Sequence, residues 1–363
     1  MENLVTPDRA FWHGRRVLIT GHTGFKGAWL CKLLSASGAQ LSGFAQKPPT
    51  DPSLYQMADV SKCIDGVEGD VRDYAALRQA IKTRRPEIIF HLAAQSLVRR
   101  SYQAPVETYS TNVMGTVNLL EALRELSLAC VVVNVTSDKC YENLESSHSY
   151  VEDDRLGGHD PYSSSKACAE LVTASYRRSF FSGADSARPI VALASARAGN
   201  VIGGGDWAAD RLVPDCVRAI MSGASIRIRN PDALRPWQHV LDPLSGYLLL
   251  AERLWNEPRA LSRAWNFGPD ESDTWPVGTL AVKLVEFWGG PVHVELATGP
   301  KPHEAQLLKL DCTLAKEVLD WRPTLDLATA LEWTVEWYKR AAEGEPAAKV
   351  TTSQIQRFLK MRE

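Results

Sequence analysis

A glycine-rich segment directly after the first apolar run constrains the fold of this 363-residue chain more than any other feature. Residues 16–20 read RVLIT, which is typical of a buried strand, and Gly21, Gly24 and Gly27 follow at every third position. Residues 27–37 then have the pattern of a helix. Glycines let a backbone turn tightly and approach a pyrophosphate at a helix N-terminus. This strand–loop–helix order therefore predicts a dinucleotide-binding loop rather than a surface turn.

Short apolar runs alternate with longer amphipathic segments throughout the first half of the chain. Such alternation predicts a Rossmann-type, doubly wound α/β fold, in which a parallel sheet is covered by helices on both faces. Ligands bind such sheets at the carboxyl ends of the strands. The further strands are expected at residues 41–44, 87–92, 130–135 and 190–194, with another ending near Val71 and followed by a helix from Asp73 to about residue 84.

The pattern loosens after about residue 200, where glycines, prolines and scattered tryptophans interrupt it. A chain of this length exceeds the usual size of one domain. We predict a Rossmann domain over residues 1–200, with a return to the sheet near residues 235–270. Residues 201–234 and 271–363 are predicted to form a smaller mixed α/β domain that covers the strand ends and holds the substrate.

Composition narrows the class of protein. A net charge of -2 gives no broad attraction to nucleic acid or to an anionic membrane. The seven cysteines show no metal-type spacing, so we expect reduced thiols and no metal site. The start of the chain lacks a signal-peptide pattern, and no apolar run is long enough to cross a bilayer. These features predict a soluble cytoplasmic protein.

The second strand lacks the acidic residue that commonly bonds the ribose 2′-hydroxyl of NAD. It ends instead in Phe44, Ala45, Gln46 and Lys47. NAD is the expected cofactor, and NADP stays open because a basic residue there could accept a 2′-phosphate. Asp70 is placed to bond the adenine amine, although a solvated turn carboxylate explains it as well.

Two polar groups are predicted to meet at the end of the fifth strand. Tyr162 and Lys166 lie four residues apart at the start of a predicted helix, so their side chains share one face. A positive Lys166 would lower the pKa of Tyr162 toward that of a useful base and could bond the nicotinamide ribose. Residues 136–139 add hydroxyls, a carboxylate and an ammonium that could serve as donor, acid and base. A capped turn with a surface ion pair is the alternative for this segment.

These residues together resemble the extended short-chain dehydrogenase/reductase family over nearly the whole chain. The matching segments are GHTGFKG at 21–27, GDVRD at 69–73, HLAAQ at 91–95, NVMGT at 112–116 and the Tyr162/Lys166 pair. Residues 136–143, 160–170, 197–208 and 235–242 resemble most the branch of that family that removes water from nucleotide sugars at C4 and C6, with CDP-glucose as the implied substrate.

The resemblance implies an NAD-dependent hydro-lyase of deoxysugar biosynthesis with no net redox change. Tyr162 would remove the proton of the 4-hydroxyl, and Ser137 would bond the 4-oxygen. Asp138 would protonate the departing 6-hydroxyl. Lys139, which stands where dTDP-glucose dehydratases carry glutamate, would remove the C5 proton as a neutral amine.

The resemblance also implies binding residues and an assembly. Contacts to NAD fall to Gly21, Thr23, Gly24, Phe25, Lys26, Gly27, Asp70, Val71, Leu92, Ala93, Ala94, Gln95, Thr111, Thr136, Tyr162 and Lys166. Contacts to the substrate fall to Asn200, Arg211, Leu212, Arg235, Asn266, His303 and Glu304. Arg235 matches a diphosphate-binding arginine, and a guanidinium fork suits that role, although a surface charge is the alternative. A homodimer or a dimer of dimers is expected, through the helices of residues 106–126 and 162–181.

Two other interpretations stay open. Another enzyme of the family, such as a nucleotide-sugar epimerase or a GDP-mannose dehydratase, would share the fold and the Tyr162/Lys166 pair. An epimerase, however, has no need of an acid and a base at positions 138 and 139. A non-catalytic dinucleotide sensor could dispense with Tyr162, which is nevertheless present.

Overall fold

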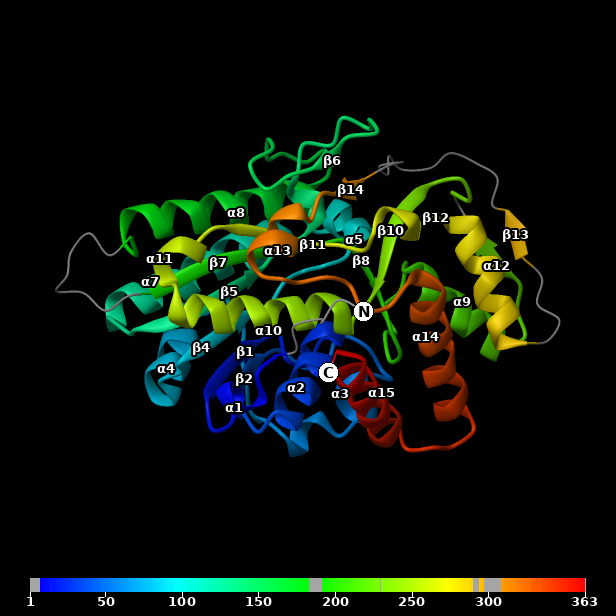
Figure 1. The fold of residues 1–363 in the computed structure, drawn as a ribbon, viewed down its shortest axis with the longest axis horizontal. Coiled ribbons are helices and arrows are strands. Elements are labelled where there is room, and N and C mark those ends of the chain that lie inside the picture. The colour runs from blue at the N-terminus through cyan, green and yellow to red at the C-terminus, as the bar shows by residue number, and fades with distance from the viewer. Residues whose placement is uncertain (1–6, 183–190, 229, 290–293, 297–307, 363) are drawn as a thin grey trace.

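A parallel sheet of seven strands forms the centre of the molecule (Figure 1), in the order β11-β7-β5-β4-β1-β2-β3. The computed structural model describes residues 7–182, 191–228, 230–289, 294–296 and 308–362. The sheet confirms the predicted Rossmann-type fold. Its strands are β1 (Arg16–Thr20), β2 (Gln40–Ala45), β3 (Asp65–Glu68), β4 (Ile88–His91), β5 (Cys130–Val135), β7 (Val191–Ala198) and β11 (Ala264–Phe267).

Alternate residues of each central strand face opposite layers of helices, as the two-residue period of a strand requires. In β5, Val131 and Val133 belong to the core on one face, and Val132 belongs to the core on the other. The first face is covered by α1 (Arg9–Trp12), α2 (Phe25–Ala36) and α10 (Leu241–Asn256), and the second by α4 (Tyr74–Arg84), α7 (Gly115–Leu126) and α8 (Pro161–Ser179).

The second half of the chain builds two smaller sheets beside the main one, on the right of Figure 1. The first comprises β8 (Asn200–Ile202), β10 (Leu234–His239) and β12 (Thr274–Pro276), and the second β9 (Ile226–Ile228) and β13 (Val294–Leu296). Helices α9 (Leu212–Met221), α12 (Val277–Trp288) and α14 (Leu327–Ala342) accompany them. The remaining elements are α3 (Leu54–Met57), η1 (Val60–Lys62), α5 (Val98–Gln103), α6 (Pro105–Tyr109), η2 (Ser110–Met114), η3 (Asp138–Cys140), β6 (Ser149–Tyr150), α11 (Pro258–Leu261), η4 (Glu271–Asp273), β14 (Lys309–Leu310), α13 (Thr313–Val318) and α15 (Ala347–Arg362).

Two elements connect the halves. Strand β11 pairs with the end of β7, which is the return to the sheet that the sequence predicts. Helix α15 contacts α2 and α3, so the end of the chain lies on the N-terminal half, although the sequence places it with the substrate domain. The division into domains at residue 200 stays a prediction.

Element boundaries differ from the predicted ones where turns are involved. Helix α2 begins at Phe25 rather than at residue 27, because Gly24 is its N-cap. Strand β3 ends at Glu68 rather than near Val71, since residues 69–73 form a turn closed by a bond from the Asp73 amide to the Asp70 carbonyl. Asp73 caps α4 by accepting a bond from the Ala76 amide, as expected. Within the described residues, no helix has the length and apolar character needed to cross a membrane.

Candidate active site

The glycine loop between β1 and α2 has the geometry of a pyrophosphate cradle. Gly21 has a φ of 75°, and a Cβ there would lie 2.7 Å from the amide nitrogen of Ala93. A Cβ on Gly27 would lie 2.2 Å from the Gly21 carbonyl oxygen, so neither position accepts a side chain. The N-cap Gly24 provides no capping side chain, which leaves amide groups of the first turn of α2 available to an anion.

Gln46 occupies the end of β2, where a ribose-binding acid is usual. Its Nε2 donates to Asp70 Oδ2 at 2.6 Å, and its backbone carbonyl oxygen accepts from Thr23 Oγ1 at 2.9 Å. Arg72 donates to both carboxylate oxygens of Asp70 and is the main cause of the lowered pKa of Asp70. The guanidinium of Arg72 at this edge is therefore already paired with a carboxylate, which disfavours its use in binding a 2′-phosphate.

Asn112 holds the end of β4 against the start of α8, although the sequence analysis did not assign it to the site. It lies in η2, a turn of π-helix, next to the predicted cofactor contact Thr111. Its Oδ1 accepts from the Gln95 amide at 2.8 Å, and its Nδ2 donates to the Gln95 carbonyl oxygen and to Ser165 Oγ. The predicted contacts Leu92, Ala93, Ala94 and Gln95 are thereby connected to the turn that carries Tyr162.

The acid and the amine predicted at the end of β5, Asp138 and Lys139, lie in η3, and the hydroxyl residue Ser137 is the N-cap of that helix. Ser137 Oγ donates to Asp138 Oδ1 at 3.0 Å and accepts from the Lys139 amide at 3.2 Å. Asp138 is buried, and burial raises the pKa of its carboxyl against the opposing charge of Lys139 and the bond from Ser137. Gly199 lies against this carboxylate, because a Cβ there would be 3.0 Å from Asp138 Oδ2. A carboxyl with a raised pKa is suited to donate a proton.

Tyr162 lies in the first turn of α8, beside Ser137 and Asp138. Burial raises the pKa of Tyr162 to about 12, and the groups that oppose this are a hydrogen bond with Ser137 and the charge of Arg211. The sequence assigns this effect to Lys166, whose Nζ instead donates to the Val135 carbonyl oxygen at 3.3 Å. Burial lowers the pKa of Lys166 to about 8, against the charge of Glu170.

Lys26 extends from the glycine loop toward the catalytic groups rather than toward solvent. Its Nζ donates to the hydroxyl of Tyr247, on α10, at 3.3 Å. Burial lowers the pKa of Lys26 to about 7; the charge of Asp138 opposes this shift, and that of Arg211 adds to it. The glycine pattern identifies Lys26 as a loop residue, but only the packing of α10 on α2 brings it beside Asp138.

A buried network of an ion pair and hydrogen bonds lies beside the end of β5 and holds it in place. Glu170 pairs with Arg197 at 2.8 Å and accepts hydrogen bonds from the hydroxyls of Thr136 and Ser195 at 2.5 and 2.7 Å. Arg197 also donates to the Tyr141 hydroxyl at 2.7 Å. Glu170 lies one helical turn after Lys166, a spacing that could have drawn attention to it in the sequence.

The predicted substrate residues have different surroundings. Arg211 donates to Asp206 Oδ2 at 2.9 Å and to Ser96 Oγ at 3.1 Å, which ties the start of α9 to the loop after β4. Arg235 is buried in β10, and its Nη1 donates to the Leu234 carbonyl oxygen. Asn200 begins β8 and Leu212 begins α9. His303 and Glu304 lie outside the described residues.

Asn266 is fully buried, and its amide is occupied by protein groups. Its Oδ1 accepts from the Tyr141 hydroxyl at 2.8 Å, and its Nδ2 donates to the carbonyl oxygens of Tyr150 and Asp311. The prediction that it contacts the nucleotide stays a prediction, and the position of its side chain supports an indirect role.

Known proteins resemble this chain over nearly its full length. The profile of a family described as GDP-mannose 4,6 dehydratase matches residues 18–334. A CDP-glucose 4,6-dehydratase of Salmonella typhimurium is 49% identical over 338 residues, which cover 93% of this chain and 94% of that protein. The chain belongs to this family, within the extended short-chain dehydrogenases/reductases.

Solved structures of the family have the same fold. A dTDP-glucose 4,6-dehydratase from Streptomyces venezuelae, crystallised with NAD, is 26% identical, with a TM-score of 0.75 over 90% of this chain and 98% of that one. The solved structure of a UDP-glucose 4-epimerase from Brucella ovis in complex with NAD is 22% identical, with a TM-score of 0.74 over 88% of this chain and 97% of that one. Dehydratases and epimerases therefore share this scaffold.

Proposed function

We propose that this member of the family is an NAD-dependent CDP-glucose 4,6-dehydratase, which converts CDP-D-glucose to CDP-4-dehydro-6-deoxy-D-glucose and water. The observation that carries the proposal is the placement of Ser137, Asp138 and Lys139 beside Tyr162. This placement adds an acid and an amine to the oxidoreductase pair. The identity of 49% with the Salmonella enzyme supports CDP-glucose as the substrate.

The residues of the glycine loop fit NAD. The bare backbone at Gly21, Gly24 and Gly27 leaves room for a pyrophosphate at the N-terminus of α2, and Asp70 lies at the adenosine end. The pairing of Arg72 with Asp70 favours NAD over NADP at this edge. NAD, when bound, supplies the capacity to accept a hydride from C4 of the sugar and to return one to C6.

Tyr162 acts as the base for the 4-hydroxyl. Removal of this proton requires the phenolate. Burial raises the pKa of Tyr162 against the phenolate, and a hydrogen bond with Ser137 and the charge of Arg211 oppose that rise. Ser137 also bonds the 4-oxygen as it becomes a carbonyl. Lys166, one turn along α8, holds the ribose of the nicotinamide.

Lys139 and Asp138 carry out the elimination. The 4-ketone acidifies C5, whose proton passes to the amine of Lys139. Asp138, whose raised pKa favours the protonated carboxyl, gives its proton to the 6-hydroxyl, which leaves as water. Tyr162 and Ser137 therefore serve the oxidation at C4, and Asp138 and Lys139 serve the elimination of water.

The nucleotide sugar lies between β8, α9 and β10. Arg211 and Arg235 bind the diphosphate through charge-assisted hydrogen bonds. Asn200 and Leu212 contact the sugar, and the resemblance assigns His303 and Glu304 to the substrate. Asn266 accepts a hydrogen bond from Tyr141, and its contact with the nucleotide stays a prediction.

The test follows the hydrogen of C4. CDP-glucose that carries deuterium at C4 should give a product with deuterium at C6, and catalytic amounts of NAD should suffice. NADH formed in proportion to sugar would indicate an ordinary dehydrogenase, and CDP-galactose as product would indicate an epimerase. The same assay with GDP-mannose, dTDP-glucose and UDP-glucose tests the preference for cytidine.

The compartment and the assembly belong to the same proposal. All seven cysteines are free thiols, which suits the reducing cytoplasm. Apolar side chains of α6 and η2 are exposed, among them Val106 at 80% and Met114 at 49%. A second copy of the chain covers this face in a homodimer, and sedimentation measurements would detect it.

A further inference from the structure

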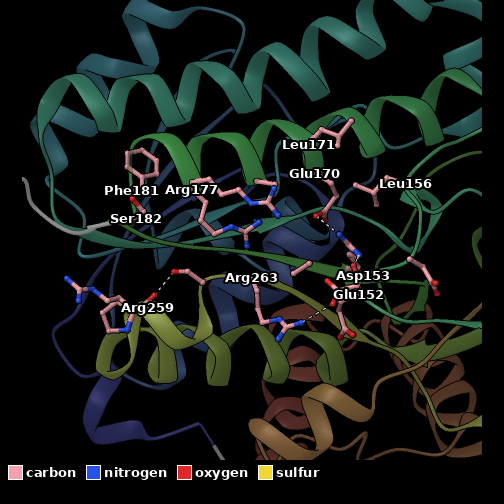
Figure 2. Close-up of a pocket in the computed structure, with 17 residues that line it drawn as sticks. Glu152, Asp153, Leu156, Glu170, Leu171, Arg177, Phe181, Ser182, Arg259 and Arg263 are labelled. Carbon is pink, nitrogen blue, oxygen red and sulfur yellow. Dashed lines mark hydrogen bonds and ion pairs between the residues drawn. The ribbon is translucent and has the colours of Figure 1, made fainter. Parts of the chain in front are cut away.

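A pocket of about 530 Å³ lies behind the catalytic end of β5, between α8 and the segment that leads into β11 (Figure 2). None of the residues assigned to NAD or to the nucleotide sugar lines it. Its walls carry several arginines and several carboxylates, and the volume is in the range of small-molecule sites. The pocket is therefore separate from the active site proposed above.

Arg177, on α8, extends into this pocket with an unsatisfied donor. Its Nη1 is buried and has no hydrogen-bond partner among the described residues. A buried guanidinium donor without an acceptor costs free energy, and a bound anion would remove that cost. Burial lowers the pKa of Arg177; the charge of Glu170 opposes this shift, and the positive charges of Arg178 and Arg197 add to it.

Two arginines of the pocket are paired with carboxylates, and two are not paired within the part of the chain that the structure describes. Arg197 and Arg263 have carboxylate partners, Glu170 at 2.8 Å and Asp153 at 3.6 Å. Arg177 and Arg178 form no ion pair with the described residues. In Figure 2, Arg259 and Arg177 lie toward one end, and Glu152 and Asp153 lie toward the other. A ligand that matches this arrangement carries an anion at one end and hydroxyl donors at the other.

We propose that this pocket binds a sugar phosphate, with the phosphoryl group against Arg177 and Arg178 and the sugar hydroxyls toward Glu152 and Asp153. Guanidinium groups bind phosphate oxygens through paired, charge-assisted hydrogen bonds. Carboxylates accept hydrogen bonds from hydroxyls and repel a second phosphate. The arrangement thus distinguishes a sugar phosphate from a diphosphate that is charged along its length.

The pocket is connected to the catalytic groups through its inner wall. Glu170 and Arg197 form part of that wall, and the same Glu170 carboxylate holds the Thr136 hydroxyl, next to Ser137. A phosphate near Arg177 adds negative charge beside Glu170 and changes the balance of this network. We expect occupancy of the pocket to alter the turnover of the nucleotide sugar through this network.

Calorimetry on the full-length, NAD-loaded protein tests binding, with saturating CDP present to occupy the nucleotide site. Glucose 1-phosphate should bind once per chain, inorganic phosphate should bind more weakly, and glucose should not bind. Arg177→Gln and Arg178→Gln should each weaken glucose 1-phosphate binding by about 10- to 100-fold, the usual effect of losing a charged hydrogen bond. Arg78→Gln, in an exposed ion pair with Glu125 on another face, is the matched control and should bind as the wild type does.

Several results would overturn the proposal. Unchanged binding in a folded Arg177→Gln protein would remove the pocket from consideration, as would binding that disappears when CDP is added. Inorganic phosphate binding as tightly as glucose 1-phosphate would contradict the sugar assignment. Turnover that glucose 1-phosphate alters equally in wild type and in Arg177→Gln would contradict regulation from this site. The turnover of CDP-glucose by the unliganded wild type tests the proposed function separately.

Discussion

Glu170 and Arg197 form an ion pair of 2.8 Å in which the two side chains are only 1% and 4% exposed. Glu170 stands on α8, the helix of Tyr162 and Lys166, and Arg197 stands on β7. Their contact fastens the catalytic helix to the sheet, and the hydroxyls of Thr136 and Ser195 complete the coordination of the carboxylate. The pair therefore sets the position of Tyr162 relative to the end of β5.

Breaking this pair should destabilise the protein strongly. Glu170→Gln leaves the charge of Arg197 buried without its counter-charge, which costs about 3–5 kcal/mol in comparable pairs. Urea unfolding monitored by tryptophan fluorescence measures the loss. Glu125→Gln removes the exposed ion pair with Arg78 and should cost less than about 1 kcal/mol. Equal losses in both variants would show that the buried pair has no special structural role.

Tyr162→Phe should abolish turnover while the fold and the glycine loop are kept. The loss should be at least about 100-fold, because proton removal from the 4-hydroxyl and oxidation at C4 are coupled. NAD binding should change little, since Lys166 remains. Formation of the 4-keto sugar is the measurement, and wild-type turnover in a folded Tyr162→Phe enzyme would exclude Tyr162 from the mechanism.

Asp138→Asn and Lys139→Ala should fail at different steps. Asp138→Asn cannot protonate the leaving 6-hydroxyl, so NADH should accumulate within a single turnover. Lys139→Ala should instead suppress exchange of the C5 proton with solvent. Absorbance at the NADH band and NMR in heavy water separate the two defects. If both variants stop at C4 oxidation alone, the assigned roles are wrong.

Lys26→Met should change the pH dependence of stability. The pKa of Lys26 is lowered to about 7 in the folded protein from an ordinary value of 10.5. Unfolding takes up a proton between these values, so the penalty of the charged lysine is full below about pH 7 and disappears as the pH rises toward 10.5. Lys26→Met should therefore gain most over wild type near pH 6, in urea titrations across this range. A gain that does not vary with pH would contradict this.

The preference for NAD over NADP depends on the residues after β2, where the adenosine of the cofactor would bind. Gln46 in place of an acid gives up a bond to the ribose, so NAD should bind less tightly than in relatives that keep the acid. Gln46→Asp should tighten NAD binding, and NADP should bind more weakly than NAD to both proteins. Calorimetric titration measures these affinities, and a preference of the wild type for NADP would overturn the assignment.

The parallel sheet, the glycine loop and the residues at the end of β5 could be predicted from the sequence. Each is encoded locally, because a β-branched strand, a glycine at positive φ and a helix N-cap depend on neighbours within a few residues. Asp73 illustrates this, since it caps α4 as predicted. The resemblance of long segments to a known family then added the chemistry.

Only the tertiary structure decided which distant groups share a buried space. Lys26 bonds to Tyr247, Asn266 bonds to Tyr141, and Glu170 pairs with Arg197. These contacts span sequence separations that no local pattern encodes. The pocket beside Arg177 also depends on α8 packing against the segment before β11. The sequence by itself determined the order of the elements and the kinds of reactive groups. The pKa values of these reactive groups depend on burial and on the distances between charges. Both are set by the packing of elements that are far apart in the chain.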